Sequence, residues 1–160
     1  MGSEEERLFI PLAFPPASLR LKRIQGSIHV WCLFRSKFLV LTPEEWVRQH
    51  LVHYLVHELG YPAGYLSLEK GTTYQQMLKR TDVLVYDAHR KPLMLIECKA
   101  ASVQLCNEVL HQVAQYNNTI EAPYVMITNG INSQVIQISK ENNALKVLNN
   151  IPDWESLTLH

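Results

Sequence analysis

The sequence predicts a mixed α/β fold with a central sheet flanked by helices, and two observations predict it. Short apolar runs bounded by turn residues occur at 83–86, 93–96 and 124–128, as expected of buried strands. Two longer segments, which begin near Thr42 and Ser102, carry apolar residues at helical spacing. From Thr42 onward, the expected order is helix, three strands, helix, strand, or αβββαβ.

Length and composition indicate one globular unit. The chain has 160 residues, of which 47% are hydrophobic and 19% charged, an ordinary composition for a domain with a buried core. We expect residues 1–41 to form an N-terminal arm and a β-hairpin packed on the core. Residues 42–154 would form the core domain and residues 155–160 a tail.

Charge argues neither for nor strongly against a nucleic-acid partner. Fifteen basic and fifteen acidic residues give a net charge of zero, whereas proteins that bind nucleic acid usually have a basic surplus. The basic residues are clustered, however, and local clusters fit phosphate binding at modest affinity. The clusters are Arg20, Lys22 and Arg23; Arg35 and Lys37; and Lys70, Lys79, Arg80, Arg90 and Lys91.

The expected compartment is the cytoplasm. Three cysteines without a Cys-x-x-Cys pair suggest reduced thiols. The acidic N-terminus is unlike a signal peptide, and no apolar run reaches the roughly 18 to 20 residues of a membrane span. We therefore expect no membrane partner.

The first half of the chain opens with an arm and a hairpin. Residues 1–27 contain three prolines and no sustained periodicity, so an extended arm is expected, and 29–34 with 38–41 should form the hairpin. Thr42 as N-cap, Pro43 and Glu45 predict a helix start with a capping box. This helix should run to about Leu59 and stop at Gly60.

The second half alternates strands with one helix. A strand is expected at 65–69, followed by the two strands around the 87–91 turn. A helix at 102–119 should end at Ala122-Pro123. A strand at 124–128, an Asn129-Gly130 turn and a hairpin of 134–138 with 144–148 complete the fold.

The candidate chemistry lies on the central hairpin. Pairing about a turn near His89 and Arg90 brings Asp82 beside Glu97, and strand alternation puts Glu97 and Lys99 on one face. Two carboxylates and an ammonium at one end of a sheet can hold a hard divalent cation and a water. The alternative is that Glu97 and Lys99 are only the solvated end of a buried strand.

Five segments of the chain form a recognisable series: 41–49 (LTPEEWVRQ), 80–82 (RTD), 96–99 (IECK), 112–117 (QVAQYN) and 128–130 (TNG). In this order they resemble the PD-(D/E)xK nuclease superfamily. Within the superfamily the chain resembles the N-terminal nuclease domain of type I restriction enzyme R proteins, in the short stand-alone form found in bacteria. The resemblance runs from about Leu12 to Trp154 and implies a restriction-endonuclease-like core. Thr81, where the superfamily motif has proline, is a departure at a position that binds no metal.

The resemblance also implies roles for individual residues. Asp82, Glu97 and the backbone carbonyl of Cys98 would hold Mg²⁺ or Mn²⁺, and Lys99 would position a water and offset charge in the transition state. Glu45 would add a helix carboxylate to the catalytic group. Four further residues would support the site or contact DNA: Gln112, Tyr116, Arg80 and Lys79.

Simpler interpretations stand beside these roles. Glu45 is equally suited to a capping box, Tyr116 to the core and Gln112 to the surface. His50, His53 and His57 share helical spacing and could form a metal face, although a polar helix face is the simpler interpretation. The H-E-x-x-H motif is absent, because its second histidine would fall at Tyr61.

Three functional hypotheses follow. The first is a metal-dependent DNA nuclease, free-standing or within a restriction or repair assembly. The second is a DNA-binding module of nuclease fold with little activity alone. The third is an assembly module, with the arm and the hairpin around Trp31 and Phe34 forming a homodimer. Expected partners are therefore DNA, restriction or repair subunits, and a second copy of the chain.

Overall fold

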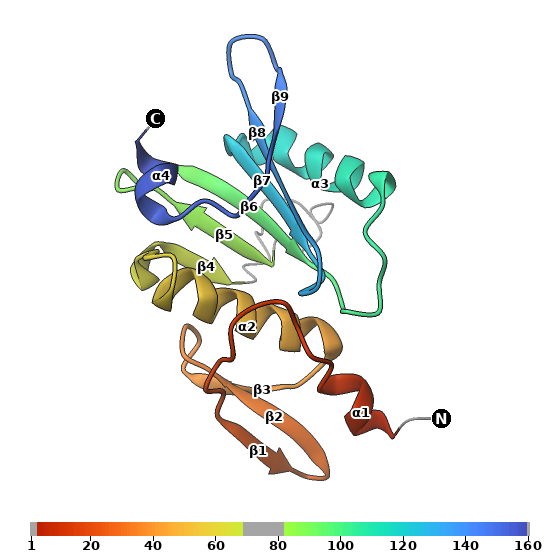
Figure 1. Cartoon of the computed structure of the whole chain (residues 1–160). Coiled ribbons are helices and arrows are strands. Elements are labelled where there is room, and N and C mark those ends of the chain that lie inside the picture. The colour runs from red at the N-terminus through yellow and green to blue at the C-terminus, as the bar shows by residue number, and fades with distance from the viewer. Residues whose placement is uncertain (1–2, 69–81, 160) are drawn as a thin grey trace.

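Two β-sheets lie on opposite sides of one long helix. The computed structural model describes residues 3–68 and 82–159, with the Tyr116 side chain excepted. Within these residues, β1 (Leu21–Ile24), β2 (Ser27–Cys32) and β3 (Lys37–Val40) form an antiparallel sheet. The larger sheet has the strand order β4-β5-β6-β7-β8-β9. Figure 1 shows helix α2 (Pro43–His57) between the two sheets.

The larger sheet is mixed. Its strands are β4 (Leu66–Leu68), β5 (Val83–Tyr86), β6 (Pro92–Cys98), β7 (Tyr124–Thr128), β8 (Ser133–Ile138) and β9 (Leu145–Leu148). All neighbouring pairs are antiparallel except β6 and β7, which are parallel. The parallel pair requires a crossover, and helix α3 (Asn107–Ile120) supplies it.

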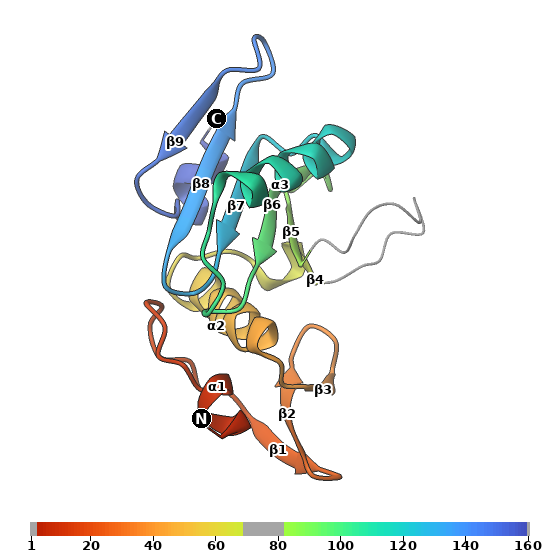
Figure 2. The same cartoon turned by 90° about the vertical axis from the view of Figure 1, so that its right-hand side faces the viewer.

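Each face of the larger sheet has its own core. Alternating residues of β5 and β6, including Val83, Val85 and Ile96, pack with α2. Residues of the opposite alternation, including Leu84 and Leu95, pack with α3. Figure 2 shows the two helices on opposite faces of the sheet.

The predicted order of elements is found from α2 to β7. Helix α2 begins where Thr42 caps it, since Thr42 Oγ1 accepts a hydrogen bond from Glu45 N at 3.1 Å. It ends two residues earlier than predicted, at His57. Helix α3 begins at Asn107 rather than Ser102. Its C-cap residue, Glu121, has a left-handed backbone conformation.

The N-terminal prediction was incomplete. The arm contains helix α1 (Glu4–Leu8) and strand β1, which extends the predicted hairpin to three strands. A 3-10 turn, η1 (Ala63–Tyr65), precedes β4, and helix α4 (Trp154–Thr158) occupies most of the expected tail. In the described part of the chain, no helix is both long and apolar enough to cross a bilayer.

Gly130 lets the arm cross the β7–β8 turn. Its φ is +84°, and Ala13 N donates to its carbonyl at 2.8 Å. A Cβ here would lie 2.6 Å from Leu12 Cδ2. We expect Gly130→Ala to lower the free energy of unfolding by roughly 1–2 kcal/mol in urea denaturation, because an L-residue is strained in this conformation.

The matched control is Gly64→Ala. An added Cβ at Gly64 meets nothing within 4 Å, so the free energy of unfolding should change by no more than about 0.5 kcal/mol. Equal losses in the two variants would contradict the backbone strain assigned to an L-residue at position 130.

Candidate active site

The β5–β6 hairpin places Asp82 and Glu97 side by side. Its register pairs Val83 with Ile96, so the next position puts Asp82 opposite Glu97. The turn lies where the sequence predicts it: an Asp87 carboxylate oxygen accepts hydrogen bonds from His89 N and Lys91 N, at 2.8 and 2.9 Å.

A backbone contact and an ion pair fix the polar groups at this end. Asp82 Oδ2 accepts a hydrogen bond from Cys98 N at 2.7 Å. Lys99 Nζ lies 3.2 Å from Glu97 Oε1, with the two side chains 31% and 19% exposed. The three groups are therefore close together yet still reachable from solvent.

Asp82 has a strongly shifted acidity. Burial, the negative charge of Glu97 and hydrogen bonding with the Glu97 side chain raise the pKa of Asp82 to about 7. The Cys98 N–H and the Arg48 guanidinium act in the opposite direction. Two carboxylates forced together in this way fit a divalent cation, which would offset their repulsion, and Mg²⁺ accepts few protein oxygens because it retains waters.

Helix α2 carries a buried polar cluster formed by Glu45, Arg48 and Gln49. Their exposed fractions are 7%, 2% and 1%. The Glu45 carboxylate accepts hydrogen bonds from both nitrogens of an Arg48 fork, one of them Nε at 3.2 Å, and from Gln49 Nε2 at 2.7 Å. The spacing i, i+3 and i+4 puts all three on one helix face.

This cluster is electrostatically linked to the hairpin. Arg48 lowers the pKa of Asp82, as noted above. Burial raises the pKa of the Cys98 thiol, the nearby charges of Asp82, Glu97 and Glu45 raise it further, and Arg48 lowers it. Glu45 thus lies near the hairpin end while its carboxylate is bound by Arg48 and Gln49. Its backbone N, rather than its carboxylate, takes part in the helix cap.

The other predicted site residues are spread more widely. Gln112 is exposed on α3, which covers the sheet face that alternation assigns to Glu97. Tyr116 lies one turn further along α3. Arg80 and Lys79 lie outside the described residues.

The alternative prediction that three histidines of α2 form a metal-binding face is wrong. Among the described residues, no group of three or more His, Cys, Asp or Glu could hold a metal ion. His50 Nδ1 instead lies 2.8 Å from the Trp46 carbonyl, and the His50 ring packs against the Trp46 ring. The role of Glu45 as a further carboxylate beside Asp82 and Glu97 stays a prediction.

Sequence reasoning missed Arg48 and Gln49. The spacing could have indicated them, because an arginine and a glutamine three and four residues after a glutamate are positioned to bind its carboxylate. Their burial was not foreseeable from the helix pattern alone, since α2 is covered by a second sheet that includes the unpredicted β1.

Comparison with known families identifies the class of this domain. A model of the "Type I restriction enzyme R protein N terminus" family matches residues 43–152, which include Asp82, Glu97 and Lys99. The chain belongs to this family.

A solved structure supports the fold. It is a fragment assigned as an HsdR subunit of a type I restriction enzyme from Vibrio vulnificus YJ016, with a TM-score of 0.51 and 17% sequence identity. The similarity covers 71% of this chain but 24% of the Vibrio chain, so this chain matches about a quarter of that fragment. No curated protein sequence matches.

Proposed function

We propose that this chain is a metal-dependent DNA nuclease domain with a restriction-endonuclease-like core. The observation that carries the proposal is the convergence of the Asp82 and Glu97 carboxylates and the Lys99 ammonium at one end of the sheet. Membership in a restriction-enzyme family supports it, because such enzymes hydrolyse DNA.

Each residue has a distinct task in this proposal. Asp82, Glu97 and the Cys98 carbonyl would hold Mg²⁺ or Mn²⁺. When bound, the ion polarises the scissile phosphate and lowers the pKa of a water. Lys99 is oriented by Glu97, 3.2 Å away, and positions the attacking water while offsetting the charge that develops on the phosphate.

The remaining predicted residues have supporting tasks. Glu45, bound by Arg48 on α2, adds a helix carboxylate to the catalytic group. Gln112 and Tyr116 on α3, together with Arg80 and Lys79, contact the DNA backbone, which fixes its position without reading sequence. The proposed setting is a bacterial cytoplasm, with restriction or repair subunits as partners.

A cleavage assay tests the proposal. The full chain is incubated with supercoiled plasmid and Mg²⁺ or Mn²⁺, beside Lys99→Ala and a matched surface variant, Lys146→Ala. We expect metal-dependent cleavage that falls at least about 100-fold in Lys99→Ala, since a group that assists the water and the developing charge typically contributes 10²–10⁴-fold.

The surface variant should cleave like the unchanged protein. Cleavage that persists in Lys99→Ala, or that needs no metal, would contradict the proposal.

The second candidate is a DNA-binding or assembly module with little activity alone, including a homodimer. The zero net charge of the chain favours it, because weak electrostatic attraction to DNA would call for a partner subunit. DNA binding without any metal-dependent cleavage would support this second candidate.

A further inference from the structure

We propose that the outer face of the small β-sheet binds single-stranded DNA by stacking unpaired bases on its aromatic rings; the choice of DNA rests on the proposed nuclease function. The sheet is formed by β1, β2 and β3. Figure 1 and Figure 2 both show α2 between this sheet and the β5–β6 hairpin. The outer face, which points away from α2, is therefore separate from the candidate active site.

Strand alternation determines which residues lie on the outer face. Val30 and Cys32 of β2 are fully buried, and Cys32 belongs to the core that includes residues of α2. Trp31, between them, therefore points away from α2. Its partner on β3 is Phe38, and on its other side Trp31 N donates a hydrogen bond to the Arg20 carbonyl at 2.8 Å. Arg20, Trp31 and Phe38 thus form a row across the outer face.

Two aromatic rings and two cations lie together on this face. The ring centroids of Trp31 and Phe38 are 5.2 Å apart in an edge-to-face arrangement. The Arg20 guanidinium carbon lies 5.4 Å from the Trp31 centroid and 5.6 Å from the Phe38 centroid. Lys22 Nζ lies 5.6 Å from the Phe38 centroid. Both rings are half-buried and both cations are exposed, so all four side chains are open to a ligand.

The cations of this face are held by aromatic rings rather than by carboxylates. The sequence contains no Asp or Glu in residues 7–43, a stretch that includes all three strands. Arg23 of β1 pairs with Glu5 at 2.6 Å, so it is not counted here. Among the described residues, neither Arg20 nor Lys22 forms an ion pair. Attraction to the ring faces holds these two cations, and their charge can still attract an anionic ligand.

Aromatic rings beside cations are the combination that single-stranded DNA requires. Each nucleotide presents a flat base, which stacks on an aromatic side chain, and a negative phosphate, which a nearby cation attracts. In a duplex the bases are already stacked on one another, so the rings could not reach their faces. An apolar protein surface would cover the rings but would leave Arg20 and Lys22 buried without a counter-charge. The charge of the face therefore favours the nucleic acid.

Affinity measured without divalent metal tests the outer face separately from cleavage. The probe is fluorescein-labelled dT20, followed by fluorescence anisotropy in EDTA with the full chain. The test variant is Trp31→Val, which removes the ring and keeps a residue suited to a strand. We expect binding at least about 5-fold weaker, because stacking of one base on an aromatic side chain contributes at least this much. Affinity for a 20-base-pair DNA duplex should not change.

Tryptophan fluorescence tests the stacking itself, in a variant that keeps the aromatic ring. A base that stacks on the Trp31 indole quenches its fluorescence, so addition of unlabelled dT20 should lower the emission of the unchanged protein. Trp31→Phe should bind within about 3-fold of the unchanged protein, since phenylalanine also stacks on bases, yet lose this quenching. The matched control is Trp154→Phe, which should keep the quenching.

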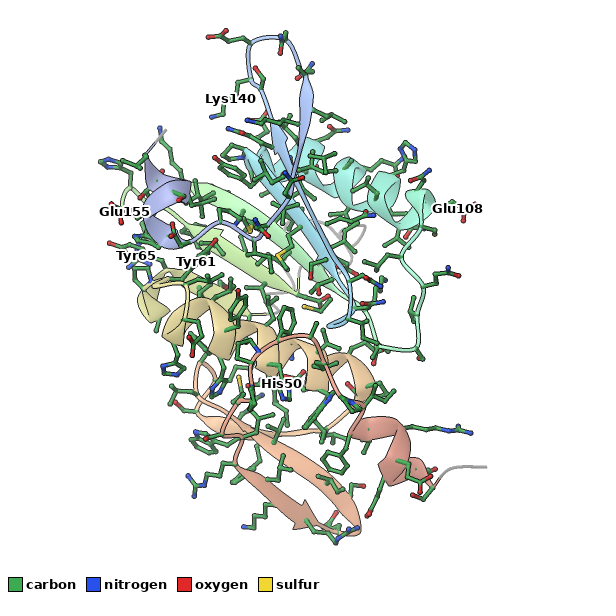
Figure 3. All side chains as sticks on the ribbon, viewed as in Figure 1. His50, Tyr61, Tyr65, Glu108, Lys140 and Glu155 are labelled. Atoms are coloured by element: carbon green, nitrogen blue, oxygen red, sulfur yellow. The ribbon has the colours of Figure 1, made fainter. Side chains whose placement is uncertain are left out.

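Trp154 suits this control because its surroundings lie elsewhere in the molecule. Its ring centroid is 5.5 Å from that of Tyr61 and 5.6 Å from that of Tyr65. Figure 3 shows both tyrosines near α4, on the opposite side of α2 from the small sheet.

The two cations are tested by the salt dependence of dT20 binding. Arg20→Gln/Lys22→Gln should lower the salt slope by about 1.4, because each lost contact with a single-strand phosphate lowers it by about 0.7. The matched control is Lys140→Gln/Lys146→Gln, which removes the same charge from the β8–β9 hairpin. Figure 3 shows Lys140 on that hairpin, far from the small sheet. The control should keep the slope of the unchanged protein.

Several results would overturn the proposed binding face. They are dT20 binding by Trp31→Val within about 2-fold of the unchanged protein, quenching that persists in Trp31→Phe, equal slopes in the two double variants, and an equal loss of duplex binding in Trp31→Val. Tighter binding of a 20-nucleotide oligo(U) than of dT20 would overturn the choice of DNA. A Trp31-dependent dimer in sedimentation, without dT20 binding, would assign the face to a second copy of the chain.

The same measurements separate this proposal from the nuclease. Lys99-dependent cleavage with unaltered dT20 affinity in Trp31→Val would overturn the binding face and leave the nuclease standing. Trp31-dependent binding of dT20 without metal-dependent cleavage would support the binding face and overturn the nuclease.

Discussion

Asp82→Asn should abolish DNA cleavage and at the same time stabilise the fold above neutral pH. Loss of cleavage follows because an uncharged amide is a poor ligand for a divalent cation. Removing several kcal/mol of metal-assisted transition-state stabilisation corresponds to a rate loss of roughly 10³-fold. The plasmid assay with Mg²⁺ measures this loss.

The gain in stability follows from the acidity of Asp82. Its folded-state pKa of about 7 lies above the usual aspartate value of 3.8, so the folded protein binds this proton more tightly than the unfolded chain. That contribution is fully present below pH 3.8 and is lost as the pH rises through about 7. At pH 8 an ionised Asp82 therefore costs up to about 4 kcal/mol, since each pKa unit corresponds to about 1.4 kcal/mol.

Asparagine avoids this cost and keeps the local hydrogen bond. Its carbonyl oxygen can accept from Cys98 N as Asp82 Oδ2 does, and its amide can donate to Glu97. Urea denaturation should therefore show Asp82→Asn more stable than the unchanged protein at pH 8, with a smaller difference at pH 5.

Asp87→Asn is the matched control in the same hairpin. Hydrogen bonds from the Lys91 and His89 N–H groups hold the pKa of Asp87 below its usual value, so its ionised form stabilises the fold above the unfolded pKa. Asp87→Asn should thus destabilise the protein at pH 8 and leave cleavage unchanged. A stability difference for Asp82→Asn that is larger at pH 5 than at pH 8 would contradict the assigned acidity.

Local signals in the sequence were sufficient for the core elements. The Thr42 cap, the apolar runs of β5 and β6 and the turn at 87–91 each depend on neighbours within a few residues, and each was predicted. Strand β1 was missed because three of its four residues are exposed, so its pattern contains no alternation. Its pairing with β2, Leu21 with Val30, is a tertiary contact.

The candidate site was predictable to the same extent. The contact between Asp82 and Glu97 follows from hairpin register, which the turn position fixes. The burial of Arg48 does not follow from the local sequence, because it depends on how α2 packs between two sheets. A sequence pattern treats Arg48 as a solvated helix residue, whereas the structure leaves it 2% exposed.

Arg48→Met should strongly destabilise the fold, because it leaves the Glu45 carboxylate buried without its cation. Both partners are nearly inaccessible, with side chains 3% and 8% exposed. Removing one partner of a buried ion pair typically costs about 3–5 kcal/mol, since the remaining charge is desolvated and uncompensated. Urea denaturation at pH 7 measures the loss.

Two comparisons separate this effect from lost packing. Glu45→Gln/Arg48→Met removes both charges and keeps the side-chain volumes, so it should recover much of the stability lost in Arg48→Met. Arg23→Met breaks the exposed pair with Glu5, whose side chains are 59% and 54% exposed, and should cost no more than about 1 kcal/mol. If Arg48→Met costs no more than Arg23→Met, the burial of the Glu45–Arg48 pair does not make it a large contributor to stability.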